Sequence, residues 1–433
     1  MSRRLCAIVL ALATTTVTGL SLAEPVHAQD IDSVAPYRLL RSLQFVQDSV
    51  VLGDHSAAEM QRFMLTTIDE RLRSADPSVF QDPRNVDAAL IYAMSGGNPQ
   101  TLEFLVARDI DGNFDNRLTD ALRRYLGGKG MLTARSLGEM VTEYRNTKIA
   151  PYLALVAGNV TIPLDPAEAL KFYDWARLTA PGTIVEEAAL RRSLAVAVDA
   201  KIVDKASLYA NSYARRFLYS PYASQFADLF VQFVVEHFEK LDREGIEATL
   251  GYMDVDRQRE VYLRMARQAA ITGKNELAVM AADRAKMLSG SAEGADLLAT
   301  LYRNLAVIPT ENVDAAMQAI VGIPDEQLSP RDRALRQAAE AVAKEVLREP
   351  ELPTESPVQA AASTTEQVPQ GAMTADDLQD PFAAPAPTVT PAPSDTGDLA
   401  TPTVELEPEM RTLIETGRSK LQAIDDLLKQ EGP

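Results

Sequence analysis

Two glutamates and two arginines lie close together in the segment PGTIVEEAALRRS: Glu186, Glu187, Arg191 and Arg192. Neighbouring carboxylates are groups that enzymes use for acid and base catalysis, and guanidinium groups suit recognition of a partner's carboxylates. The same residues also fit the start of a helix. Thr183 and Glu186 have the spacing of a capping box, and Glu187 precedes Arg191 by four residues, one helical turn. The helix explains both glutamates, and it leaves Arg191 and Arg192 as candidate partner-binding residues.

A second oxygen-rich stretch, RDIDGNFDNRLTD, has the spacing of a calcium-binding loop. Its oxygen-bearing residues occupy loop positions 1, 3, 5, 7 and 12: Asp109, Asp111, Asn113, Asp115 and Asp120. The pattern departs from the calcium loop because the glycine is at position 4 rather than 6 and the final ligand is Asp rather than Glu. A turn through Asp111-Gly112 followed by an Asp or Asn helix cap explains the same residues. We therefore expect a turn here and no metal ligand.

Other reactive residues are few. Beyond the N-terminal signal sequence described below, the only histidines are His55 and His237, and the chain has no metal-binding H-E-x-x-H motif, no nucleophile elbow and no phosphate-binding loop. His55 comes just before a helix start, and His237 stands at helical spacing among aromatic residues. We expect no catalytic residue and no cofactor. A hydrolase that uses two carboxylates, such as a polysaccharide-cleaving enzyme, remains the alternative to a binding protein.

The N-terminus reads as a secretory signal peptide. Two arginines precede an apolar run from Leu5 to Leu22, and small residues precede a cleavage site between Ala28 and Gln29. The only cysteine, Cys6, lies inside this segment. We therefore expect an exported protein that has neither a disulfide nor, after cleavage, a membrane span, and an uncleaved membrane anchor is the alternative.

The formal net charge of −18 disfavours a nucleic-acid partner, because binding to phosphates requires clustered Lys and Arg side chains. A protein partner is expected instead.

Most of the chain has the pattern of short helices. Apolar residues recur at intervals of three and four, and helix-start signals follow each other along the chain. Ser56 and Thr183 each precede a capping-box glutamate, and five other cap residues precede a proline: Asp82, Asn98, Asp165, Ser220 and Ser329. The pattern predicts an all-α fold over residues 29–350.

A longer period suggests a helical-repeat α-solenoid of a degenerate tetratricopeptide-like type. Ala169, Tyr173, Ala176 and Pro181 have the spacing of the second helix of such a repeat. The frame recurs about one and about three units of 36 residues later, at Ala206, Ala210 and Tyr213 and at Ala278, Ala282 and Ala285. An irregular helical domain with the same caps is the alternative.

The C-terminal part differs in composition. Residues 351–408 are rich in Pro, Ala, Thr and Ser, which predicts a disordered linker. Residues 409–430 are periodic again, with Leu421, Ile424 and Leu428 in the apolar stripe of a predicted amphipathic helix. We expect this helix to bind a groove of the array or a partner.

Three segments together resemble the MotC family of periplasmic motility proteins: PYRLLRSLQFVQDSVVLGDHSAAEMQRFMLTTIDERL, NVDAALIYAMSGGNPQTLEFLVARDIDGNFDNRL and LTAPGTIVEEAALRRSLA. The resemblance covers about residues 36–340. It implies a non-enzymatic protein required for flagellar rotation, with the periplasmic part of the stator protein MotB as its partner. It supplies no functional residues.

Overall fold

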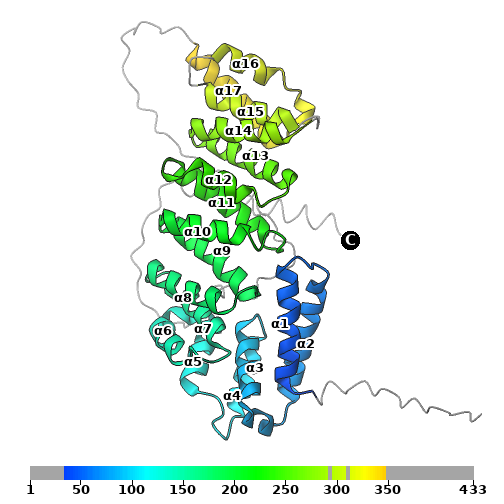
Figure 1. Ribbon diagram of the computed structural model, residues 1–433, viewed down its shortest axis with the longest axis vertical. Coiled ribbons are helices and arrows are strands. Elements are labelled where there is room, and N and C mark those ends of the chain that lie inside the picture. The colour runs from blue at the N-terminus through cyan, green and yellow to red at the C-terminus, as the bar shows by residue number, and fades with distance from the viewer. Residues whose placement is uncertain (1–33, 291–294, 309–312, 348–433) are drawn as a thin grey trace, which may run out of the picture. The chain divides into compact units, whose positions relative to one another are not determined.

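The computed structural model describes residues 34–290, 295–308 and 313–347, and every regular element within these ranges is a helix (Figure 1). The all-α prediction is therefore confirmed. The predicted signal peptide (1–28), the linker (351–408) and the segment 409–430 lie outside the described residues, so those predictions stay untested. Among the described helices, none combines the length and the apolar character that a membrane span requires.

The α-helices follow in this order: α1 (Pro36–Val51), α2 (Ala57–Ser74), α3 (Pro83–Met94), α4 (Pro99–Ala107), α5 (Asn116–Arg124), α6 (Ala134–Glu143), α7 (Ala150–Thr161), α8 (Pro166–Thr179), α9 (Ile184–Asp199), α10 (Val203–Ala214), α11 (Ala223–His237), α12 (Arg243–Leu250), α13 (Val255–Ile271), α14 (Asn275–Leu288), α15 (Ala295–Val307), α16 (Val313–Val321) and α17 (Pro330–Val346).

Four of the predicted caps are confirmed. The side chains of Asp82, Asn98, Asp165 and Ser329 each accept a hydrogen bond from a backbone N–H two or three residues later, at 3.0–3.2 Å. In each case a proline follows the cap and starts the helix. This arrangement satisfies one of the N–H groups that a helix start leaves without an intrahelical partner.

Three predicted caps are wrong. The Ser56 hydroxyl donates to Asp54 Oδ1, and the Thr183 hydroxyl donates to the carbonyl of Ala180, so neither accepts from its helix. Ser220 accepts from the N–H of Tyr222, and α11 begins only at Ala223. Hydroxyl groups bond readily to nearby backbone and side-chain acceptors, and at Ser56 and Thr183 such a local hydrogen bond forms in place of the helix cap.

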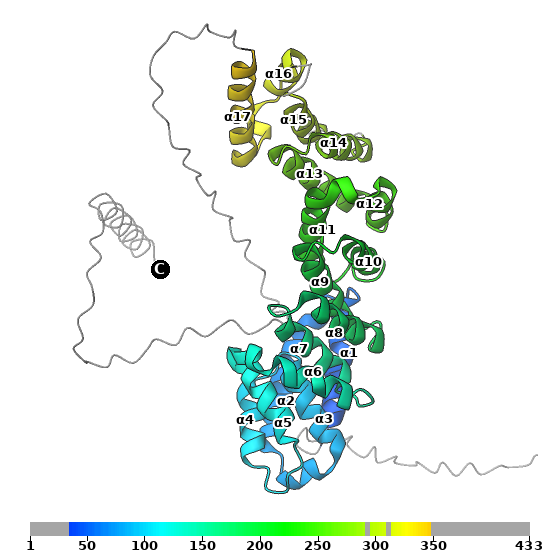
Figure 2. The ribbon, with the colours of Figure 1, turned by 90° about the vertical axis from the view of Figure 1, so that its left-hand side faces the viewer.

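Most successive helices from α6 onward pack against each other, among them α6 with α7, α7 with α8, α8 with α9, α9 with α10, α13 with α14 and α14 with α15, whereas α12 packs against α10 and α11 against α13. In Figure 2, α9, α11 and α13 lie along one side of this stack and α10, α12 and α14 along the other. All but one of the predicted repeat residues lie on the second helix of a pair and are buried, each with an exposed fraction of 0–1%: Ala169, Tyr173, Ala176, Ala206, Ala210, Tyr213, Ala278, Ala282 and Ala285. Pro181 follows the end of α8 and is exposed. Small side chains at these places let neighbouring helices approach closely.

Polar contacts between helices join residues about one repeat apart. Along one side, Arg192 reaches Asn159, Arg191 reaches Gln225, and Arg264 reaches Asp228. Along the other side, Lys205 reaches Asp174 and Arg284 reaches Glu247. The sequence separations of these pairs are 31–37 residues. Each helix is thus tied to the equivalent helix of the next pair, as in a repeat array whose units contact only their neighbours.

The hairpin of α1 and α2 departs from this neighbour-only pattern. Helix α1 packs against α3 and also against α9. Gln44 on α1 donates to the Tyr152 hydroxyl on α7 at 2.9 Å, and Asp48 on α1 accepts from the backbone N–H of Ile184 at the start of α9. The first helix therefore covers part of α9.

Candidate functional site

The cluster at the start of α9 is a buried ion pair. The Arg191 side chain donates from Nε to Glu187 Oε1 at 3.0 Å, which confirms the predicted contact one turn apart. Glu187 is 0% exposed and Arg191 is 6% exposed. Tyr213 on α10 donates to the same Glu187 oxygen at 2.8 Å, and Gln225 on α11 accepts from Arg191 Nη1 at 3.0 Å. The pair therefore joins three helices.

The environment keeps the Tyr213 hydroxyl a donor. Burial, with the adjacent Glu187 carboxylate, holds the pKa of Tyr213 well above its usual range. The Arg191 guanidinium also lies over the ring of Tyr222, 4.6 Å from its centroid. Every polar group of this buried cluster thus has an internal partner, which is the condition under which a buried charge is tolerated.

Glu186 has a different internal role. One of its oxygens accepts from the backbone N–H of Gly182 at 2.6 Å, one residue before the N-cap Thr183 whose N–H a capping box would use, so the predicted capping box does not form. Both of its oxygens also lie 2.8 Å from Nη1 of Arg216, two residues after the end of α10. The carboxylate pair of Glu186 and Glu187 is therefore held by two arginines and a tyrosine.

Arg192 contacts α7, the equivalent helix of the preceding pair. Its Nη1 donates to Asn159 Oδ1 on α7 at 3.2 Å, and the Tyr173 hydroxyl on α8 donates to the same oxygen at 2.8 Å. Asn159 in turn donates to the Tyr125 hydroxyl at 3.0 Å. Arg192 is partly exposed, whereas Arg191 is buried. Their contact with a partner stays a prediction, because these internal contacts do not test it.

The aspartate-rich loop forms the predicted turn. Gly112 has a φ of +70°, and the Asp109 carboxylate accepts from the backbone N–H groups of Asn113 and Phe114, each at 2.9 Å. Phe114 is buried and packs on the ring of Phe80. The Asp109 carboxylate therefore stabilises the turn through these hydrogen bonds, as the sequence predicts.

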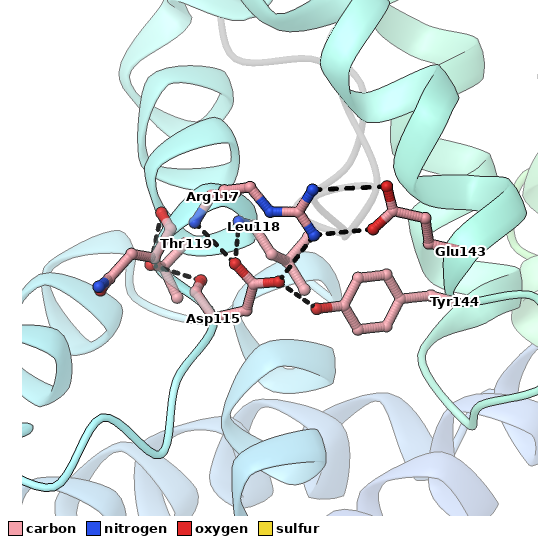
Figure 3. Close-up of polar contacts among 7 residues, drawn as sticks. Asp115, Arg117, Leu118, Thr119, Glu143 and Tyr144 are labelled. Carbon is pink, nitrogen blue, oxygen red and sulfur yellow. Dashed lines mark hydrogen bonds and ion pairs between the residues drawn. The ribbon is translucent and has the colours of Figure 1, made fainter.

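Asp115, the last aspartate before α5, ties that helix to α6 (Figure 3). It accepts from the backbone N–H of Arg117 at 2.8 Å and from the Tyr144 hydroxyl at 2.7 Å. Arg117 forms an ion pair with Glu143 at 2.7 Å. Burial raises the pKa of Asp115, but the hydrogen bonds from Tyr144 and Arg117 outweigh it and hold that pKa below its usual range. The predicted cap is confirmed, with a link to α6 in addition.

The two histidines differ in surroundings. His237 is buried beside the ring of Phe233, as its spacing predicts. His55 is exposed and lines a cavity of about 300 Å³ together with Tyr219 of the α10–α11 connection and Arg257 of α13. Arg257 donates to the carbonyl of Leu218 at 2.7 Å. In the described part of the chain, His55 thus lines a cavity, whereas His237 is packed in the interior.

A second hollow lies between α12, α14 and α15 and has a volume of about 570 Å³. Its apolar lining consists of Val279, Met280 and Met287 of α14 with Ala306 and Val307 of α15. Because Met287 is 65% exposed, this groove presents apolar surface to solvent.

The family model described as Chemotaxis protein MotC matches residues 1–433. A relative from Rhizobium meliloti (strain 1021), also described as Chemotaxis protein MotC, is 51% identical over 438 residues and is covered completely, as is this chain. The chain belongs to the MotC family. No solved structure matches it. Membership in the MotC family supports a role in bacterial motility, and the resemblance found in the sequence is confirmed.

Two features of this MotC-family fold differ from the sequence prediction. The α9 glutamates are buried rather than only part of a helix start, and the apolar residues throughout the segment IVEEAALRRSLAVAV are the signal for it, because that pattern is typical of a fully buried helix. The role of Asp48 has no local signal in the sequence, because its partner is 136 residues away. The predicted residues Ala28, Gln29, Leu421, Ile424 and Leu428 lie outside the described residues.

Proposed function

We propose that this chain is a periplasmic, non-enzymatic scaffold of the flagellar motor that binds the periplasmic part of the stator protein MotB. The observation that carries the proposal is the end-to-end match to the MotC family, with a relative 51% identical over its full length. The N-terminal signal pattern supports export. The MotB partner comes from the family resemblance.

The geometry supports a scaffold. Ion pairs and hydrogen bonds one repeat apart hold neighbouring helices in register, and such stacked helices present an extended surface to a partner. The most closely spaced acids, Glu186 and Glu187, are held by Arg216, Arg191 and Tyr213. In the described part of the chain, no observation favours the two-carboxylate hydrolase.

Binding to MotB can be measured directly. The purified mature chain, residues 29–433, is titrated with the purified periplasmic part of MotB in a calorimeter. We expect saturable binding that an unrelated periplasmic protein does not show. Absence of binding, together with normal swimming of cells that lack this chain, would contradict the proposal.

The site of action needs a separate test in cells that lack the chain. The full chain should restore swimming, and a variant without residues 2–28 should accumulate without restoring it. Restored swimming by that variant would place the function outside the periplasm, and equal abundance of the two proteins is the control.

A further inference from the structure

Helices α5 and α6 form a hairpin. At one end of it, Arg117 near the start of α5 pairs with Glu143 at the end of α6, and Asp115 accepts from Tyr144 (Figure 3). The two helices therefore run in opposite directions. The end of α5 and the start of α6 lie together at the other end of the hairpin, joined by residues 125–133. We call residues 123–135 the basic segment.

The basic segment differs in charge from the rest of the chain. Its sequence is RRYLGGKGMLTAR, and no acidic residue occurs between Asp120 and Glu139, although the whole chain has a formal net charge of −18. Its four basic residues are Arg123, Arg124, Lys129 and Arg135. A local positive charge on an acidic protein indicates a surface for an anionic partner.

Three of these cations are open to solvent. Arg124 and Lys129 are exposed and have no ion pair in the described part of the chain. Arg135 pairs with Glu139, but its side chain is 94% exposed, and exposed pairs of this kind are weak. Arg123 is held by carboxylates of α4 and α5. An anionic partner can therefore reach Arg124, Lys129 and Arg135.

Apolar side chains lie between these cations. Met131 is 58% exposed and Leu132 is 73% exposed. The backbone on either side of Lys129 is fixed to the array, because Tyr125 is buried and accepts from Asn159 of α7 at 3.0 Å. Gly130 also approaches α7 so closely that a Cβ there would lie 2.7 Å from a side-chain atom of that helix. The connection thus packs on the array through Tyr125 and Gly130 and leaves two aliphatic side chains in water.

Exposed aliphatic side chains next to Lys and Arg are typical of protein surfaces that bind anionic membranes. The aliphatic groups enter the boundary between headgroups and acyl chains, and the cations stay at the lipid phosphates with their apolar stems along that boundary. A protein partner is less favoured by this composition, because lysine is depleted at protein interfaces. The acidic remainder of the chain is repelled by such a membrane, so attraction is confined to the basic segment.

We propose that the basic segment binds an anionic phospholipid surface. Met131 and Leu132 insert at the headgroup boundary, and Arg124, Lys129 and Arg135 contact the lipid phosphates. This surface goes beyond the proposed function and does not depend on MotB, so its test uses the mature chain and lipid vesicles alone.

Vesicle flotation tests the charge requirement. Residues 29–433 should float with vesicles made of equal parts phosphatidylcholine and phosphatidylglycerol and should stay behind with phosphatidylcholine alone. Arg124→Glu together with Lys129→Glu should weaken binding by about tenfold or more. The matched control, Arg215→Glu with Lys286→Glu, reverses two exposed cations elsewhere and should change binding by less than about twofold. No flotation with either vesicle, equal flotation with both, or equal loss in the two charge variants would overturn the proposal.

The apolar requirement has its own matched control. Met131→Ser with Leu132→Ser should weaken binding to the mixed vesicles by about tenfold. Met287→Ser with Leu178→Ser removes the same two residue types, which are 65% and 66% exposed, and should leave binding unchanged. Thermal melts of all variants check that they are folded, and Lys129→Arg, which keeps the charge, should bind like the unaltered chain. Equal binding by the two serine variants would contradict insertion of Met131 and Leu132.

A fluorescent label locates the contact. Residues 29–433 contain no cysteine, so Leu132→Cys can be labelled with a polarity-sensitive dye. Its emission should shift to the blue with mixed vesicles, whereas the same dye at Leu178→Cys should not respond. A shift at Leu178 alone would place the contact elsewhere and overturn the proposal. Binding of polyglutamate through Lys129, without binding of vesicles, would assign the segment to an acidic protein partner instead.

Discussion

The carboxylate of Asp48 accepts a hydrogen bond from the backbone N–H of Ile184 at 2.9 Å. Ile184 is the first residue of α9, and Asp48 lies near the end of α1, 136 residues earlier. Asp48 thus supplies the cap that the Thr183 hydroxyl does not provide. A negative side chain at this place also interacts favourably with the positive end of the helix dipole.

Asp48 should make stability depend on pH. Burial raises the pKa of its carboxyl to about 6, although the N–H of Ile184 opposes the shift. Since the folded protein binds this proton more tightly than the unfolded chain, the free energy of unfolding should decrease as pH rises from about 4 to about 6. Asp48→Asn keeps an acceptor oxygen and removes the titration. It should flatten this slope and stabilise the protein by on the order of 1 kcal/mol at pH 7.

Urea unfolding at several pH values measures this effect. The difference between the wild-type chain and Asp48→Asn cancels the contributions of other carboxyl groups. If the two proteins show the same pH slope between about pH 4 and 6, the carboxyl does not titrate in that range.

Breaking the buried ion pair should be costly. Arg191→Met leaves the Glu187 carboxylate buried without its guanidinium, which should reduce the free energy of unfolding by about 3–5 kcal/mol. Arg135 and Glu139 form a matched pair four residues apart, but their side chains are 94% and 62% exposed, against 8% and 0% for Arg191 and Glu187. Arg135→Met should cost less than about 1 kcal/mol. Chemical denaturation measures the free energy of unfolding of both variants. Similar decreases in Arg191→Met and Arg135→Met would show that burial does not determine the strength of the pair.

Arg192 should contribute to stability. Its Nη1 donates to Asn159 Oδ1, so Arg192→Glu would bring a carboxylate towards an acceptor oxygen and should cost about 1–3 kcal/mol. The exposed Lys286→Glu makes the same change in net charge and is expected to cost less than about 0.5 kcal/mol. Partner binding, measured at a temperature where both variants are folded, then shows whether Arg192 also contacts a partner. Equal stability of the two variants would contradict the internal role.

The aspartate-rich loop should not need calcium. Asp109→Ala removes the acceptor for two backbone N–H groups and should cost about 1–3 kcal/mol, with or without a chelator. Thermal melts in calcium and in chelator provide the measurement. A melting temperature that rises with calcium in the wild-type chain, but not in Asp109→Ala, would instead establish a metal site.

Export should remove the first 28 residues. Small residues at Val26 and Ala28 fit the subsites of the processing enzyme, so the mature chain is expected to begin at Gln29. Intact mass measurement of protein from the periplasmic fraction determines the start. A protein that retains Met1 would indicate an uncleaved anchor.

Residues that act within one helix or one repeat were predictable from the sequence. The buried alanines of α8, α10 and α14 follow from spacing, and the caps at Asp82 and Asn98 follow from a cap residue before proline. Contacts that depend on how helices meet were not predictable. The hydrogen bonds between Glu187 and Tyr213 and between Asp48 and Ile184 depend on how the helices pack, and no periodicity in the sequence predicts those partners.

The link from α1 to α9 has a consequence for the order of folding. Contacts one repeat apart can form while the chain leaves the ribosome, since each needs only the next pair of helices. The hairpin of α1 and α2 emerges first, but the N–H group that Asp48 caps belongs to a residue made 136 positions later. Closing so long a loop lowers the entropy of the chain before the contact can contribute to stability. We therefore expect α1, which packs early against α2 and α3, to complete its native contacts only after α9 has been made.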